Sequence, residues 1–192
     1  MRLKKLFDQN FKYLYEINNL KLKKKKKEAE IMKFSLQVAI ERYEEAILQV
    51  NGDQAKRVAF AIMGMEALYN SDSDKETIGF KLKIRSSKIL SFFGLNAIEI
   101  AKSISKAYGI RSSYAHGTAT SKDLSFEFEE KIIDILRISI IIFLQIKITK
   151  PKFIQLMNES FYDKGRDKEL ISMLRNIKKA VNLNVNRKIY LL

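Results

Sequence analysis

Residues that interrupt helices are rare in this chain. The 192 residues include one proline, Pro151, and seven glycines. Because proline and glycine are the strongest helix breakers, long stretches that lack them predict a mostly helical protein. No segment alternates between apolar and polar residues over the length of a β-strand. We therefore expect an all-α fold.

Apolar residues recur at three- and four-residue intervals through most of the sequence, which is the spacing of amphipathic helices. The helices expected from this spacing cover residues 2–20, 30–50, 75–91, 95–116 and 123–148. A further helix is expected between the second and third of these, with Asp53 as its cap and an apolar stripe that ends at Tyr69. The polar loop 71–74 is expected to cap the helix over 75–91. The helix over 123–148 is apolar on nearly every face, so it lies either at the centre of the core or between the core and a second subunit.

These segments divide the chain into three parts. Residues 1–28 form a basic amphipathic N-terminal helix or arm, residues 29–150 an antiparallel bundle of four to five helices, and residues 151–192 a C-terminal helical extension. The pattern after Pro151 predicts a helical hairpin with Gly165 at its turn. A length of 192 residues suits one domain with such an appendage.

The net charge of +14 is concentrated at the two ends of the chain. Residues 1–27 carry 10 Lys/Arg and 2 acidic residues, and residues 147–192 carry 11 and 4, whereas the residues between them carry 15 and 16. Two basic ends on a nearly neutral body favour attraction of a polyanion, of which RNA and DNA are the usual cases. A lysine-rich composition, with 27 Lys against 9 Arg, can also produce such ends without a binding role.

The composition also disfavours several kinds of site and location. Without cysteine there are no disulfides or thiolate ligands, and a single histidine, His116, disfavours a zinc site, so we expect neither a metal nor another cofactor. The longest apolar run, 138–148, is well short of the roughly 20 residues that a membrane helix needs. No apolar signal segment follows the basic N-terminus. We therefore expect a cytoplasmic protein without membrane insertion.

Three charged residues lie within the apolar stripes of their helices: Glu66, Arg85 and Arg111. Because a buried charge without a partner costs several kcal/mol, each must find a partner. One interpretation is a structural network in which Glu66 pairs with Arg85 or Arg111. In the other, Arg111 faces a cleft or a subunit interface that a phosphate can reach, and Glu66 orients it.

His116 follows Arg111 by five residues. This pair can cleave RNA without a metal, because histidine moves protons near neutral pH and arginine holds a phosphate and its developing charge. Five residues along a helix correspond to about 140° of rotation and roughly 7.5 Å of rise, so the two side chains do not share a face. Either the helix ends near His116, with Gly117 as its C-terminal cap, or the site is completed across a two-fold axis.

The segment Arg111-Ser-Ser-Tyr-Ala-His116-Gly117 resembles the Arg-x4-6-His signature of HEPN domains, and in particular of their ApeA-like branch. Upstream, residues 61–68 (AIMGMEAL) and 81–90 (KLKIRSSKIL) resemble two further helices of that branch, in the same order and at similar spacing. The resemblance covers about residues 30–150.

The resemblance implies a HEPN-like bundle of four or five helices that dimerises and brings two Arg-x4-6-His segments into one cleft. It implies metal-independent RNA cleavage, with His116 as the proton-transfer group for attack of the 2′-hydroxyl and Arg111 as the phosphate anchor. Such cleavage leaves a 2′,3′-cyclic phosphate and a 5′-hydroxyl. Members of this family often act as RNA-cutting toxins or as effectors of antiviral defence.

Four further residues are assigned to RNA contact or to support of the catalytic pair: Ser112, Glu66, Arg85 and Tyr114. Ser112 stands where many active members carry Asn, Asp or His, although its hydroxyl can still hydrogen-bond a phosphate. The alternative function is therefore a non-catalytic module that binds RNA or a nucleotide and dimerises within a larger defence or toxin–antitoxin system. A third hypothesis is a helical dimer that docks on an effector or antitoxin through residues 1–27 or the C-terminal hairpin.

Overall fold

The computed structural model describes residues 26–48, 53–71, 74, 77–118 and 124–181. These residues form seven α-helices and no β-strand. The helices are α2 (Lys26–Leu48), α3 (Gln54–Tyr69), α4 (Ile78–Phe92), α5 (Ala97–Ala115), α6 (Phe126–Leu144), α7 (Lys150–Glu159) and α8 (Lys164–Ala180). The expected all-α class is confirmed, whereas the helix expected over 2–20 and the stretch 182–192 lie outside the described residues.

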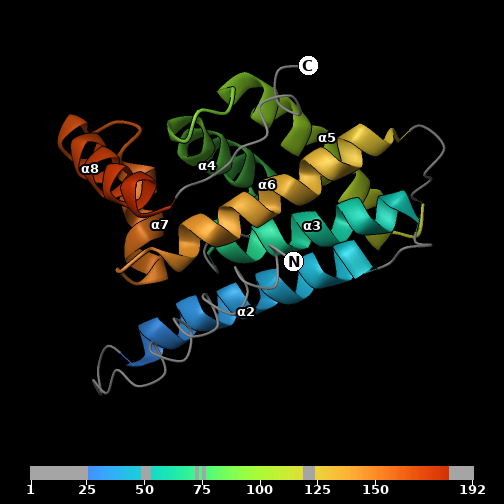
Figure 1. Ribbon diagram of the computed structural model, residues 1–192, viewed down its shortest axis with the longest axis horizontal. Coiled ribbons are helices and arrows are strands. Elements are labelled where there is room, and N and C mark those ends of the chain that lie inside the picture. Colours follow the sequence, from blue (N-terminus) through green and yellow to red (C-terminus); the bar gives the residue numbers. More distant parts are fainter. Residues whose placement is uncertain (1–25, 49–52, 72–73, 75–76, 119–123, 182–192) are drawn as a thin grey trace.

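Helix α3 is the centre of the bundle. It packs against α2, α5 and α6, and α4 packs mainly against α5. Figure 1 shows α2, α3 and α6 side by side, with α4 and α5 together on another side and α7 and α8 at one end. The helices α7 and α8 form the hairpin expected after Pro151, and this hairpin contacts the bundle through α2 and α4.

The apolar character of α6 on all faces is explained within a single chain. Four of its residues outside the main apolar stripe are nevertheless buried by neighbouring helices: Ile133, Ile140, Ile141 and Leu144. Of the two placements that the sequence allows, the central one is therefore observed. A second subunit is not required to cover this helix.

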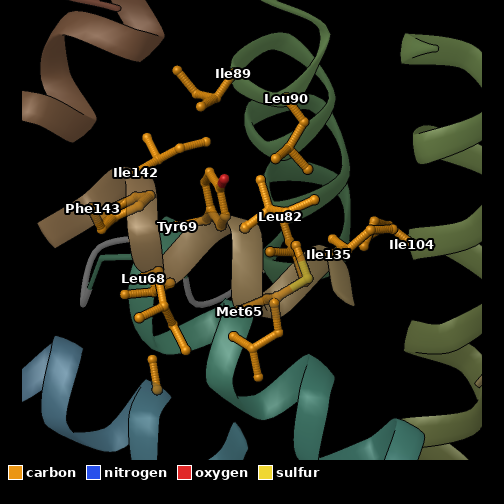
Figure 2. Close-up of a cluster of buried hydrophobic side chains, with 14 of the residues drawn as sticks. Met65, Leu68, Tyr69, Leu82, Ile89, Leu90, Ile104, Ile135, Ile142 and Phe143 are labelled. Atoms are coloured by element: carbon orange, nitrogen blue, oxygen red, sulfur yellow. The ribbon is translucent and has the colours of Figure 1, made fainter. Parts of the chain in front are cut away.

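Figure 2 shows a cluster of the core in which buried side chains of α3, α4 and α6 meet, together with Ile104 of α5. Side chains from all three helices converge there: Met65, Leu68, Tyr69, Leu82, Ile89, Leu90, Ile135, Ile142 and Phe143. The Tyr69 ring meets Phe143 edge to face at 5.0 Å between centroids, and the Tyr69 hydroxyl lies 3.1 Å from Ser139 Oγ. Burial raises the pKa of Tyr69, so this hydroxyl stays protonated and keeps its hydrogen-bond partner.

The caps and turns in the structure agree with those expected from the sequence at some positions and differ at others. Asp53 caps α3 as expected, because its side chain accepts a hydrogen bond from the Ala55 amide at 2.9 Å. Gly165 does not lie in the turn between α7 and α8. It is the second residue of α8, and its amide donates to the capping side chain of Asp163.

The expectation that the loop 71–74 caps α4 is wrong. The helix begins at Ile78, and Thr77, which precedes it, makes no side-chain capping hydrogen bond. Asp74, expected to help cap this helix from the preceding loop, instead binds the guanidinium of Arg85. A buried guanidinium requires a counter-charge far more strongly than a helix start requires a cap, so the carboxylate goes to the arginine.

Candidate functional site

The candidate site lies on the C-terminal half of α5. Asn96 caps the start of this helix, and the buried residues Ile100, Ile104 and Ala107 anchor its inner face against the bundle. Arg111 lies one turn further along the same face, and 30% of its side chain is exposed. The guanidinium therefore lies at the edge of the core, where solvent reaches it.

Arg111 pairs with Glu66 of α3. Arg111 Nη2 donates to Glu66 Oε2 at 2.9 Å, which ties α5 to α3. Burial raises the pKa of Glu66, and the charge and hydrogen bond of Arg111 only partly oppose this shift. Glu66 Oε1 and Arg111 Nε are buried and have no hydrogen-bond partner among the described residues. The pair is therefore held by one hydrogen bond and lacks the two-point geometry of a purely structural arginine clamp.

Aromatic rings lie on both sides of this pair along α5. The Arg111 guanidinium carbon lies 6.0 Å from the centre of the Tyr108 ring, one turn earlier. One turn later, Tyr114 meets Phe60 of α3 edge to face at 6.2 Å between ring centroids. Arg42 adjoins the same Phe60 ring, with its guanidinium carbon 5.5 Å from the ring centre. Tyr114, which the sequence assigns to RNA contact or support, is thus half-buried against α3.

His116 lies at the end of α5, as one of the two sequence interpretations expects. The helix ends at Ala115, and Gly117 has a φ of +70°, a conformation that glycine adopts without strain. The Gly117 amide donates to the Tyr114 carbonyl at 3.1 Å, and the Thr118 amide donates to the Ser113 carbonyl at 2.8 Å. This pair of bonds is a Schellman cap. It turns the chain away and leaves His116 exposed.

The two proposed catalytic side chains do not face the same way in one chain. A helical separation of five residues places them about 140° apart and roughly 7.5 Å along the axis. The His116 imidazole makes no hydrogen bond or ion pair with the described residues. Ser112 is half-buried, and its carbonyl accepts the backbone hydrogen bond of His116 at 3.1 Å. Among the described residues, Arg111 is therefore held by Glu66, whereas His116 is exposed.

Arg85 has a different role from the one that the sequence suggests. Its side chain is 1% exposed and forms an ion pair with Asp74, with Nη1 at 2.5 Å from Oδ2. Arg85 also donates to the Tyr69 carbonyl at 2.7 Å and to Asn158 Oδ1 at 2.9 Å. Burial alone would raise the pKa of Asp74, but hydrogen bonds from Arg85 and Lys81 outweigh it and hold that pKa far below its usual value.

This network separates Arg85 from the Glu66–Arg111 pair. Its hydrogen bonds go to the end of α3, to the loop before α4 and to α7, and none of them reaches Glu66 or Arg111. Arg85 is therefore a structural residue that joins the α7–α8 hairpin to the bundle. Of the two partners considered for Glu66, the structure selects Arg111.

One residue beside the Glu66–Arg111 pair, Tyr108, is not among the site residues assigned from the sequence. Its ring is half-buried beside Arg111. The available signal was the three-residue spacing between Tyr108 and Arg111, because residues three apart are neighbours on a helix surface.

The described residues contain no group of three or more His, Cys, Asp or Glu side chains placed to hold a metal ion. None of the helices in this part of the chain is both long and apolar enough to cross a membrane.

Comparison with known proteins gives no further assignment. No family model matches the chain, and neither the curated proteins nor the solved structures contain a significant match.

Proposed function

We propose that this chain is a metal-independent endoribonuclease of the HEPN type that acts as a homodimer. The observation that carries the proposal is the arrangement on α5, where a half-buried arginine held by Glu66 precedes an exposed histidine at a Schellman-capped helix end. A toxin or antiviral effector is the kind of role that this activity serves.

Arg111 is suited to bind a phosphate. Its Nη2 is engaged by Glu66 and its Nε is buried, so the exposed part of the guanidinium presents Nη1 to a ligand. Arginine donors are effective where negative charge develops on a phosphate in the transition state. Glu66 fixes the guanidinium before RNA arrives, which reduces the entropy lost on binding.

His116 supplies the proton transfers. One imidazole accepts the proton of the ribose 2′-hydroxyl as this oxygen attacks the adjacent phosphorus, and the bond to the 5′-oxygen breaks. The leaving 5′-oxygen takes a proton, and the products are a 2′,3′-cyclic phosphate and a 5′-hydroxyl. Because base and acid act on opposite sides of the phosphorus and each chain has one histidine, two copies of the chain together provide both groups.

The test is cleavage of single-stranded RNA by the full-length protein in EDTA. We expect products with 2′,3′-cyclic phosphate ends, and losses of about 100- to 10,000-fold in rate for His116→Ala and about 100- to 1,000-fold for Arg111→Ala. Arg175→Ala, which removes an exposed arginine on α8, is the matched control and should cleave like the wild type. Cleavage by both site variants at the wild-type rate, or a strict need for a divalent cation, would refute the proposal.

The alternative is non-catalytic RNA binding, and a separate cluster around Phe60 of α3 favours it. Phe60 is flanked by Arg42 and Lys56 and by the Tyr114 ring. Aromatic rings among basic side chains are typical of surfaces that bind single strands. RNA binding that falls with rising salt, together with intact RNA after long incubation, would select this alternative.

A further inference from the structure

A groove opens between the start of α4 and the middle of α5. Its volume is about 420 Å³, within the usual range for small-ligand sites. The side chains that define it are Phe80 and Lys83 from α4 and Ser105 and Tyr108 from α5. The Arg111–His116 chemistry does not use this groove, and no residue lining it was singled out from the sequence as a site residue.

The absence of a side chain at Gly79 shapes the groove. A Cβ atom at this position would lie 2.7 Å from Cε1 of the Tyr108 ring, closer than such atoms approach in proteins. Glycine therefore lets the ring of Tyr108 lie directly against the backbone of α4. This contact fixes the Tyr108 ring at the junction of α4 and α5, where it forms part of the groove wall.

The opposite wall combines an exposed ring with a positive charge. Phe80 is 58% exposed. Lys83 Nζ lies 5.3 Å from the centre of the Phe80 ring. No acidic side chain among the described residues forms an ion pair with Lys83. An exposed ring and an uncompensated ammonium together suit a ligand that is both aromatic and anionic.

The groove lies next to the candidate catalytic arginine, which is not itself part of its lining. The same Tyr108 ring that lines the groove lies 6.0 Å from the guanidinium carbon of Arg111. Tyr108 and Arg111 are three residues apart on α5, so the groove and the arginine are neighbours on the helix surface. A polymer with alternating bases and phosphates matches this order of groups.

We infer that the groove binds one unpaired nucleotide of the RNA strand, next to the phosphate that Arg111 holds. The base stacks on Phe80 and Tyr108, Lys83 contacts the neighbouring phosphate, and the exposed Ser105 hydroxyl can hydrogen-bond the base edge. This inference rests on the proposed function in taking RNA as the ligand. Because a base in the groove must be unpaired, the groove selects single-stranded over double-stranded RNA. Because every base can stack on an aromatic ring, it imposes little sequence preference.

The test measures binding of a ten-nucleotide, 2′-O-methylated single strand that carries one 2-aminopurine, a base whose fluorescence falls when it stacks. This strand cannot be cleaved through its 2′ position, so binding is separated from catalysis. For Phe80→Ala in the full-length protein we expect about 5- to 100-fold weaker binding and loss of the fluorescence quenching. For Lys83→Gln we expect the salt dependence of log K to fall by about 0.7.

Matched controls come from other exposed side chains. Phe126, which is 57% exposed at the start of α6, is changed to alanine, and Lys168, exposed on α8, is changed to glutamine. Both variants should bind and quench like the wild type. Equal losses in Phe126→Ala and Phe80→Ala would overturn the inference, as would wild-type binding without quenching or no wild-type binding at all.

The outcome for the groove is distinguishable from the outcome for the nuclease. If the wild type releases cyclic-phosphate products while Phe80→Ala binds normally, the groove assignment fails and the nuclease stands. If Phe80→Ala loses binding and quenching but no RNA is ever cleaved, the nuclease fails and the groove remains a site for single-stranded RNA. Capture of an apolar peptide with Phe80 buried, in place of RNA, would also overturn the assignment.

Discussion

Replacing Arg85 with methionine should destabilise the fold without removing any group from the proposed site. Methionine keeps much of the volume of the side chain but none of its donors. Arg85 is 1% exposed, and its partner Asp74 is 2% exposed, so water cannot replace the lost contacts. The carboxylate of Asp74 would keep its contact with Lys81, at 2.7 Å, as its remaining ion pair among the described residues.

The size of the effect follows from the burial of this pair. Removing one partner of a buried ion pair costs about 3–5 kcal/mol, because an uncompensated charge stays behind. Lys81 is 36% exposed and still contacts Asp74, so we expect the lower end of that range, about 3 kcal/mol. For a chain of this length each kcal/mol lowers the melting temperature by roughly 2–4 °C, which gives a fall of about 6–12 °C.

The assay is urea and thermal unfolding followed by circular dichroism, in a double-mutant cycle with Asp74→Asn. Each single variant removes one charge of the buried Arg85–Asp74 pair and leaves the other in place, whereas the double variant Asp74→Asn/Arg85→Met removes both charges. We expect the double variant to lose about 2 kcal/mol less than the sum of the single losses. Arg175→Met on α8, where the side chain is exposed, should change stability by less than about 0.5 kcal/mol.

Two results would refute this reasoning. A loss of less than about 1 kcal/mol for Arg85→Met would mean that the buried pair is not what joins the loop, α4 and α7. Additive losses in the cycle would mean that Arg85 and Asp74 act independently. Arg85→Met with normal stability but no RNA cleavage would restore the sequence-based assignment of Arg85 to the functional site.

Three further predictions concern stability. Gly64→Ala should lower the free energy of unfolding by about 1–3 kcal/mol, because its Cβ would lie 2.8 Å from Leu136 Cδ2 between α3 and α6. Gly109→Ala on α5, where the new Cβ would meet open space, should raise it by about 0.5–1 kcal/mol, and the urea midpoints of the two variants check both expectations. Gly117→Ala should cost about 1–2 kcal/mol, since φ there is +70°, and a thermal melt with a smaller loss for Gly117→Asn checks it. The lowered pKa of Asp74 means that its stabilising effect is present above the ordinary carboxyl pKa of about 4 and is lost as the pH falls below it, so Asp74→Asn should flatten the acid limb of the stability–pH curve; equal slopes would contradict this.

Local features of the site were accessible from the sequence because they depend on residues close together in the chain. The end of α5 at His116 follows from Gly117, and the cap of α3 follows from Asp53. The need for a partner at Arg111 follows from its place in an apolar stripe. The identity of that partner does not, because Glu66 lies 45 positions away and only the packing of α3 against α5 brings the two together.

Asp74 and Arg85 show the same difference between local and long-range contacts. Asp74 looks like a helix cap in the sequence, and Arg85 looks like a third member of the Glu66–Arg111 network. Both interpretations treat local position as decisive. In the folded chain Arg85 also reaches Asn158, 73 residues away on α7, and this long-range contact directs it away from the site.

The sequence by itself determined that this chain is helical and where most of its helices lie. It also determined that α5 carries an arginine in its apolar stripe and ends at a glycine cap. These properties arise from hydrogen bonds and side-chain spacing within a few turns. The tertiary structure alone decided that Glu66 neutralises Arg111, that Asp74 neutralises Arg85, and that Gly79 and Tyr108 form a groove beside the arginine. Buried charges and close contacts are satisfied by whichever groups packing brings near, and that choice depends on the whole fold.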